Sequence, residues 1–127
     1  MVDKIKTHKD LDVWKESIEL ARLVYLMTSK FPKEELYGIT QQIRRSAVSI
    51  SSNIAEGAAR NSKKEFIQFL YISMSSSAEV RSHLYVALDQ SYIDQTLFDK
   101  IYGQSDKVGK MISNLIKYLR GMSKSAK

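Results

Sequence analysis

Residues 36–60 read LYGITQQIRRSAVSISSNIAEGAAR, and the spacing of the apolar residues in this stretch indicates the fold class. These residues recur three and four positions apart, as on one face of an α-helix. The apolar stripe comprises Leu36, Ile39, Ile43, Ala47, Ile50 and Ile54. Glu34 and Glu35 precede the stripe, and negative charge in a first turn stabilises a helix. We therefore predict a helix over residues 34–60.

Pro32 separates this helix from another apolar pattern on its N-terminal side. The residue before a proline avoids the helical conformation, so the preceding helix must end near residue 30. Asp10 can cap the start of that helix. Its apolar residues again lie three and four positions apart, at Leu11, Trp14, Ile18, Ala21 and Tyr25. We predict a helix over residues 11–30 that buries Trp14.

Two further helices follow residue 60. The string Ser62-Lys63-Lys64-Glu65 has the form of a capping box, in which the serine and glutamate side chains pair with backbone N–H groups at a helix start. It predicts a helix over residues 63–89. A turn over residues 89–93 leads to Asp94, which can cap a last helix over residues 95–120.

No segment alternates between apolar and polar residues with period two, so we predict no strand. Four helices joined by short turns predict an antiparallel up-down-up-down four-helix bundle of the all-α class. The length of 127 residues suits a single domain over residues 1–127. We expect frayed ends at residues 1–9 and 121–127.

The composition excludes several classes of function. The chain has no cysteine, which excludes disulfides, thiolate catalysis and cysteine metal sites. No apolar run reaches the length of a membrane span. The histidines are His8 and His83, and a metal site needs several converging donors. We expect a cytoplasmic, non-enzymatic protein with no catalytic residue, no cofactor, no metal and no membrane association.

The helices over residues 34–60 and 63–89 carry small and apolar residues beside their main stripes, where a lone bundle would be charged. Exposed apolar faces of this kind mark interaction sites, so we expect a homo-oligomer. The predicted subunit interface consists of Val48, Ser52, Ala55, Ala59, Ile67, Tyr71 and Met74. The alternative is a wide core, in which these residues pack within one subunit.

The net charge of +6 lies at the C-terminal end of the chain, because residues 107–127 hold six basic residues and no acidic residue. Such asymmetry indicates an anionic partner such as nucleic acid. The candidate contacts are Lys107, Lys110, Lys117, Arg120 and Lys124, with Arg44, Arg45 and Arg60 as a second group. The alternative is that the lysines only keep the surface soluble and suit a helix C-terminus.

Several strings of the sequence match the pattern of one known family. They are LDVWK at residues 11–15, QIRRSAV at 42–48, NIAEG at 53–57 and KEFIQFL at 64–70. The chain resembles the four-helix bundle proteins encoded in intervening sequences of bacterial 23S ribosomal RNA genes. The resemblance implies a ring-shaped homopentamer. A related branch is the accessory protein of diversity-generating retroelements. Resemblance to that branch implies a basic pentameric barrel that binds nucleic acid and a reverse transcriptase.

These observations support two hypotheses of function. The first is a non-enzymatic homo-oligomer, expected to be a pentamer, that binds RNA or DNA through phosphate contacts without base readout. The second is a protein-interaction scaffold with no direct nucleic-acid role, whose partner would be a reverse transcriptase or a ribosome-associated factor.

Overall fold

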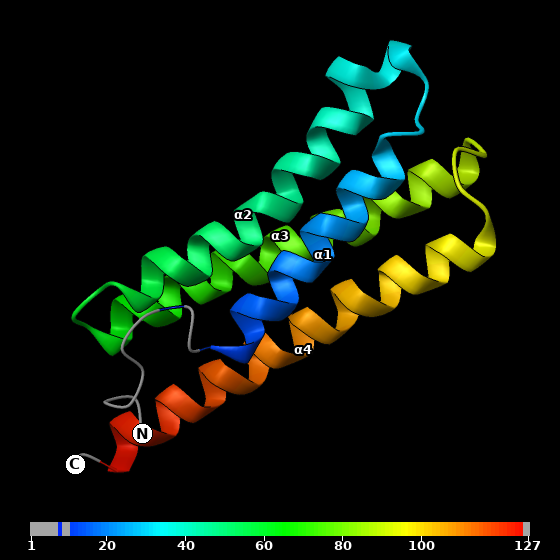
Figure 1. Cartoon of the computed structure of the whole chain (residues 1–127). Coiled ribbons are helices and arrows are strands. Elements are labelled where there is room, and N and C mark those ends of the chain that lie inside the picture. Colours follow the sequence, from blue (N-terminus) through cyan, green and yellow to red (C-terminus); the bar gives the residue numbers. More distant parts are fainter. Residues whose placement is uncertain (1–7, 9–10, 126–127) are drawn as a thin grey trace.

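The protein is all-α, as predicted. The computed structural model describes residue 8 and residues 11–125, with side chains through residue 121. Its four α-helices are α1 (Asp12–Thr28), α2 (Gln41–Ala58), α3 (Lys63–Asp89) and α4 (Gln95–Ser125), and the described residues contain no strand. Helix α1 packs against α2 and α4, and α3 packs against the same two helices (Figure 1).

The predicted helix starts after residue 60 are confirmed. Helix α3 spans the predicted residues, and the Ser62 Oγ accepts a hydrogen bond of 3.1 Å from the Glu65 backbone N–H. The Asp94 Oδ1 accepts one of 2.9 Å from the Leu97 N–H. Helix α4 continues to Ser125, beyond the predicted end at residue 120. Asp10, the predicted cap of α1, lies outside the described residues.

The prediction of one continuous helix from residue 34 is wrong. The chain instead forms a 3-10 turn, Lys33–Glu35, and a π-helical turn, Leu36–Thr40, before α2 begins. The turn is kinked at Gly38, whose φ of −106° and ψ of −121° are not helical. The kink rotates the start of the predicted stripe away from the core, so that Leu36 is exposed.

The predicted apolar stripe of α1 is also wrong, because the helix is rotated about its axis and buries a neighbouring face. The helix buries Val13, Ser17, Leu20, Val24 and Met27, among others. Ile18 and Tyr25 are 42% and 45% exposed. Trp14 is half-buried, with its ring edge-on to that of His8 at 4.8 Å between centroids. Helix α1 is apolar on two adjacent faces, and packing against α2 and α4, rather than spacing alone, selects which one is buried.

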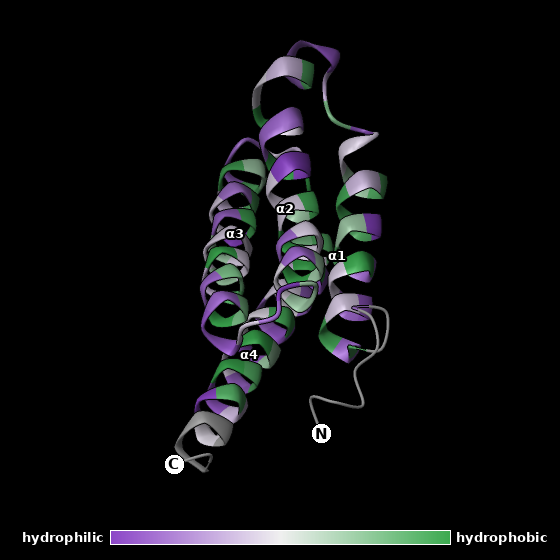
Figure 2. Ribbon diagram, turned by 90° about the vertical axis from the view of Figure 1, so that its left-hand side faces the viewer, coloured by the Kyte–Doolittle hydropathy of each residue, from purple (hydrophilic) through white to green (hydrophobic). Residues whose placement is uncertain are grey.

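Amphipathic packing gives the bundle its core. Figure 2 shows hydrophilic and hydrophobic residues alternating along the helices, as expected when one face of each is buried. The largest fully buried side chains include Leu20, Ile43, Ile50, Leu70 and Ile112, which come from all four helices.

Serines line the contacts that α3 makes with its neighbours. The Ser73 Oγ donates to the Ile50 carbonyl of α2 at 2.9 Å. On the other side, the Ser77 Oγ donates to the Ser105 carbonyl of α4 at 2.9 Å. These bonds satisfy buried hydroxyls, and the small side chains bring the helices close together. The Tyr85 ring contacts Phe98 at 5.0 Å, so residue numbers rise along α3 as they fall along α4.

The two turns at one end of the bundle are tied together. The Tyr92 hydroxyl donates to the Glu35 carboxylate at 2.7 Å, which raises the pKa of Tyr92. The Tyr92 ring also packs against Phe31. Two residues after the end of α3, Ser91 adopts the left-handed conformation at φ 60°, and the following N–H, of Tyr92, bonds to the Ala87 carbonyl. This pairing satisfies the last carbonyls of the helix.

Candidate nucleic-acid interface

The basic residues of α4 form an exposed row. Lys107, Lys110 and Lys117 are exposed, whereas Val108 and Ile112 of the same helix are buried. This row therefore points away from the core, as predicted. The side chain of Lys124 lies outside the described residues.

Two of these lysines already have acidic neighbours. The Lys107 Nζ lies 3.2 Å from the Glu16 Oε1, and the Lys110 Nζ lies 3.1 Å from the Asp106 Oδ2. A hydrogen bond from Gln104, together with Lys107, lowers the pKa of Glu16. Exposed ion pairs of this kind are weak, so a phosphate could compete for either lysine. Lys117 has no ion-pair partner among the described residues.

Three of the four predicted arginines stack on aromatic rings of the chain itself. The Arg120 guanidinium lies 5.3 Å from the centroid of Tyr71. The Arg60 guanidinium lies 5.0 Å from Phe69, and it also pairs with Glu56 at 2.9 Å. Both therefore stabilise the bundle, although both remain exposed.

Arg44 is the third stacked arginine. Its guanidinium lies 4.6 Å from the Tyr25 ring centroid, and its Nε donates to the Thr28 Oγ1 at 2.7 Å. Arg44 thereby joins α2 to α1. The fourth arginine, Arg45, is exposed on the next position of α2 and has no ion-pair partner within the described part of the chain.

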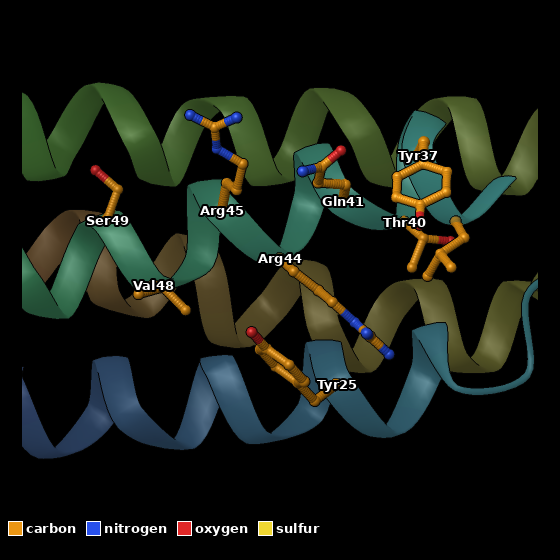
Figure 3. A pocket seen from close by; sticks show the side chains of 9 residues that line it. Tyr25, Tyr37, Thr40, Gln41, Arg44, Arg45, Val48 and Ser49 are labelled. Atoms are coloured by element: carbon orange, nitrogen blue, oxygen red, sulfur yellow. The ribbon is translucent and has the colours of Figure 1, made fainter.

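Arg44 and Arg45 line one hollow of about 540 Å³ between α1 and the start of α2 (Figure 3). We name it the α1–α2 hollow. Its other lining residues are Tyr25, Leu36, Tyr37, Thr40, Gln41, Val48 and Ser49. The lining thus combines aromatic and aliphatic side chains with two cations and contains no acid. The eight predicted contacts do not form one surface, because this hollow holds two of them and α4 holds the lysines.

Sequence reasoning missed the hollow itself. Leu36 and Tyr25 were predicted as core residues, yet both are exposed along it, and Tyr37 is 85% exposed. The signal that could have identified it is Gly38 inside an otherwise helical pattern, because glycine permits the kink that turns these residues outward.

Thr40, which lines the α1–α2 hollow, also carries the one buried side-chain polar atom without a hydrogen-bond partner among the described residues. This atom is the Thr40 Oγ1, in a residue that is only 3% exposed. Buried hydroxyls are normally paired. The kinked turn at Gly38 interrupts the helical geometry in which a threonine hydroxyl bonds the carbonyl of the preceding turn.

A second hollow, of about 400 Å³, lies between α2 and α3 and is polar. It is lined by Arg45, Ser49, Ser76, Glu79 and His83, among others. The Ser49 and Ser76 hydroxyls share a hydrogen bond of 2.9 Å across it. No group of three or more histidine, aspartate or glutamate side chains converges anywhere in the described residues.

The predicted interface residues fall into two separate sets. Val48 and Ser52 of α2 are exposed, as is Ala59 directly after the helix, and Ala55 of α2 is half-buried. On α3, Tyr71 lies at the seam with α4, beneath Arg120. The others on α3, Ile67 and Met74, pack partly against the subunit's own core. For Ile67 and Met74, these contacts favour the alternative of a wide core, in which they pack within one subunit.

The string at residues 53–57 makes contacts within and just after α2 and one close approach to α3. The Asn53 Nδ2 donates to the Ser49 carbonyl at 2.8 Å, and Glu56 pairs with Arg60. Gly57 lies against Phe66 and Phe69 of α3, so close that an added Cβ would approach the Phe69 Cβ to 2.8 Å. Gly57 therefore has a structural role in the packing of α2 against α3, whereas these contacts of Asn53 and Glu56 join residues one helical turn apart.

No helix in the part of the chain that the structure describes is both long and apolar enough to cross a membrane. A family model for the 23S rRNA-intervening sequence protein matches residues 9–114. No curated protein matches the chain.

One similar solved structure is a protein of unknown function from the S23 ribosomal protein family of Bacteroides thetaiotaomicron. It is 28% identical to this chain and superposes with a TM-score of 0.75. The match covers 83% of this chain and 98% of that one. Because the family model spans most of the sequence, the chain belongs to the 23S rRNA-intervening sequence protein family.

Proposed function

We propose that this protein is a non-enzymatic, cytoplasmic homo-oligomer of up-down-up-down bundles that binds RNA or DNA through phosphate contacts. The observation that carries the proposal is the charge excess of +6 on the C-terminal part of the chain, where Lys107, Lys110 and Lys117 stand on the exposed side of α4. Binding to phosphates strengthens with each neutralised charge. An oligomer would repeat this row once in every subunit.

The assembly proposed is a ring, with a pentamer as the expected form. A closed ring uses head-to-tail contacts, in which one surface of a subunit meets a different surface of the next. The two sets of predicted interface residues suit such an arrangement. Exposed Ser52 of α2 and Ala59, the residue after that helix, would mark one surface, and the α3–α4 seam around Tyr71 would be the other. Val48 instead lines the α1–α2 hollow.

The test measures affinity for RNA and DNA at several salt concentrations, for wild type and for the double variant Lys110→Gln, Lys117→Gln. Glutamine removes the charges without placing a second acid beside Asp106. We expect the lysine variant to bind nucleic acids of unrelated sequence more weakly, and to a similar extent for each sequence. The slope of log affinity against log salt should be shallower by roughly 0.9 for each phosphate that the variant no longer neutralises. The matched control is Lys15→Gln, Lys30→Gln, which removes two exposed lysines outside α4 and should leave the slope near the wild-type value.

Equally weakened binding in the two double variants would show that α4 is not the binding surface. Absence of wild-type binding even at low salt would overturn the nucleic-acid proposal. The protein-interaction scaffold would then be favoured, because Lys107 and Lys110 have acidic partners and large apolar side chains such as Tyr37 and Val48 face outward. A reverse transcriptase or a ribosome-associated factor would be the partner to test.

A further inference from the structure

We infer that the α1–α2 hollow holds an unpaired base of single-stranded nucleic acid, with Arg45 on a neighbouring phosphate. The inference rests on the proposed nucleic-acid function and adds a specific mode, namely a preference for single strands. The lysine row of α4 has an exposed tyrosine beside it, Tyr118, which the experiment below compares with Tyr37.

Tyr37 presents an open aromatic ring at the edge of the hollow. Its side chain is 85% exposed, so the fold gains little from burying it, yet the kinked turn at Gly38 holds it beside the hollow (Figure 3). Exposed aromatic rings beside a basic groove are the recurrent platforms for unpaired bases. The other aromatic residue, Tyr25, already has Arg44 over its ring, which leaves Tyr37 as the stacking surface.

The lining of the hollow is positively charged. Arg44 and Arg45 both line it, and no carboxylate does. Arg44 is engaged with Tyr25 and Thr28, whereas Arg45 has no ion-pair partner among the described residues. Glu79 lines the neighbouring polar hollow that Arg45 also borders, but no ion pair joins the two side chains. Arg45 is therefore placed for an incoming phosphate.

A base carries carbonyl and ring-nitrogen acceptors on its edge, which an amide N–H beside the hollow can pair once the ring enters. The exposed amide of Gln41 borders the same space. A flat, polar-edged ring with an attached anion therefore fits the lining better than an aliphatic side chain does.

The experiment uses the full chain and a short RNA containing one 2-aminopurine, offered as a single strand and as a duplex. Stacking on an aromatic ring is worth roughly five- to a hundredfold in affinity. We expect the single strand to bind with quenching of the base's fluorescence, and Tyr37→Ala to weaken that binding roughly tenfold. Duplex binding should not change, because paired bases cannot enter the hollow.

Tyr118→Ala, which removes an exposed tyrosine of α4, is the matched control and should bind the single strand like wild type. Arg45→Gln should weaken the single strand and reduce the salt slope, whereas Arg22→Gln on α1 should not. Circular dichroism and the oligomer mass should be unchanged in all four variants, since each of these side chains is exposed.

Several results would overturn the inference. One such result is that the wild-type protein binds single strands and duplexes with equal affinity, and that Tyr37→Ala and Tyr118→Ala bind the single strand equally well. The proposed function would then stand, but the hollow would have no part in it. A smaller oligomer mass for Tyr37→Ala would show that a second copy of the chain fills the hollow. Wild type that binds neither probe would overturn the inference and the proposed function together.

Discussion

Replacing Gly57 with alanine probes how closely α2 approaches α3. A Cβ at this position would lie 2.8 Å from the Phe69 Cβ, 2.9 Å from the Phe66 Cδ1 and 3.3 Å from the Phe66 carbonyl oxygen. The Phe69 Cβ and the carbonyl oxygen are fixed to the α3 backbone, so rotation of a side chain cannot relieve these contacts. The two helices would have to move apart around Gly57.

The magnitude follows from two opposing effects. Overpacking a close contact costs about 1–3 kcal/mol. Alanine regains up to about 1 kcal/mol of helix propensity, and less here, because Gly57 is one residue from the end of α2 at Ala58. We therefore expect Gly57→Ala to lower the free energy of unfolding by about 1–2 kcal/mol, which is roughly 3–8 °C in melting temperature for a domain of this size.

The assay is thermal or urea unfolding at fixed protein concentration, since the stability of an oligomer depends on concentration. Gly103→Ala is the matched control, because it lies within α4 and an added Cβ there meets nothing within 4 Å. That variant should be more stable than wild type by up to about 1 kcal/mol. A Gly57→Ala protein as stable as wild type would refute the close approach of α2 to α3.

Three further predictions concern stability. Leu20→Ala should lower the free energy of unfolding in urea by about 2–5 kcal/mol. Trp14→Ala should lower it by less, because Leu20 is fully buried and Trp14 is not. The reverse order would mean that α1 is rotated about its axis. Arg81→Met should cost about 1.5–3 kcal/mol, since its Nη1 donates to the Ser77 and Ser105 hydroxyls between α3 and α4; an unchanged urea midpoint would contradict this. Because the folded-state pKa of Glu16 is below its ordinary value of 4.5, its stabilisation is present above that value and disappears as pH falls through the folded-state pKa. The stability gap between wild type and Glu16→Gln should therefore close on acidification, and a gap that persists in acid would count against the bond to Gln104.

Local signals predicted much of the fold. The spacing in residues 36–60 and the caps at Ser62 and Asp94 depend on neighbouring residues, so the sequence contains them directly. The rotation of α1 could not be predicted, because its two apolar faces are nearly equivalent until α2 and α4 pack against it. Conformational freedom at Gly38 likewise allowed either a continuous helix or the kinked turn that is observed.

The candidate site was less predictable for a related reason. Charge in the sequence located the lysines of α4, but the distances to Glu16 and Asp106 depend on the folded arrangement. The α1–α2 hollow joins Tyr25 of one helix to Tyr37 and Arg45 across the turn between them. Helical spacing places residues on faces of one element, and it contains no information on which faces of two elements leave a space between them.

Nucleic-acid binding through phosphate contacts is tested best by a salt titration of the wild-type protein. Affinity would be measured for two RNA oligonucleotides of equal length and unrelated sequence, from low to physiological salt. We expect similar affinities for both, and a linear fall of log affinity with log salt whose slope corresponds to several neutralised phosphates. Absence of binding at the lowest salt, or affinity that does not change with salt, would contradict phosphate recognition by this protein.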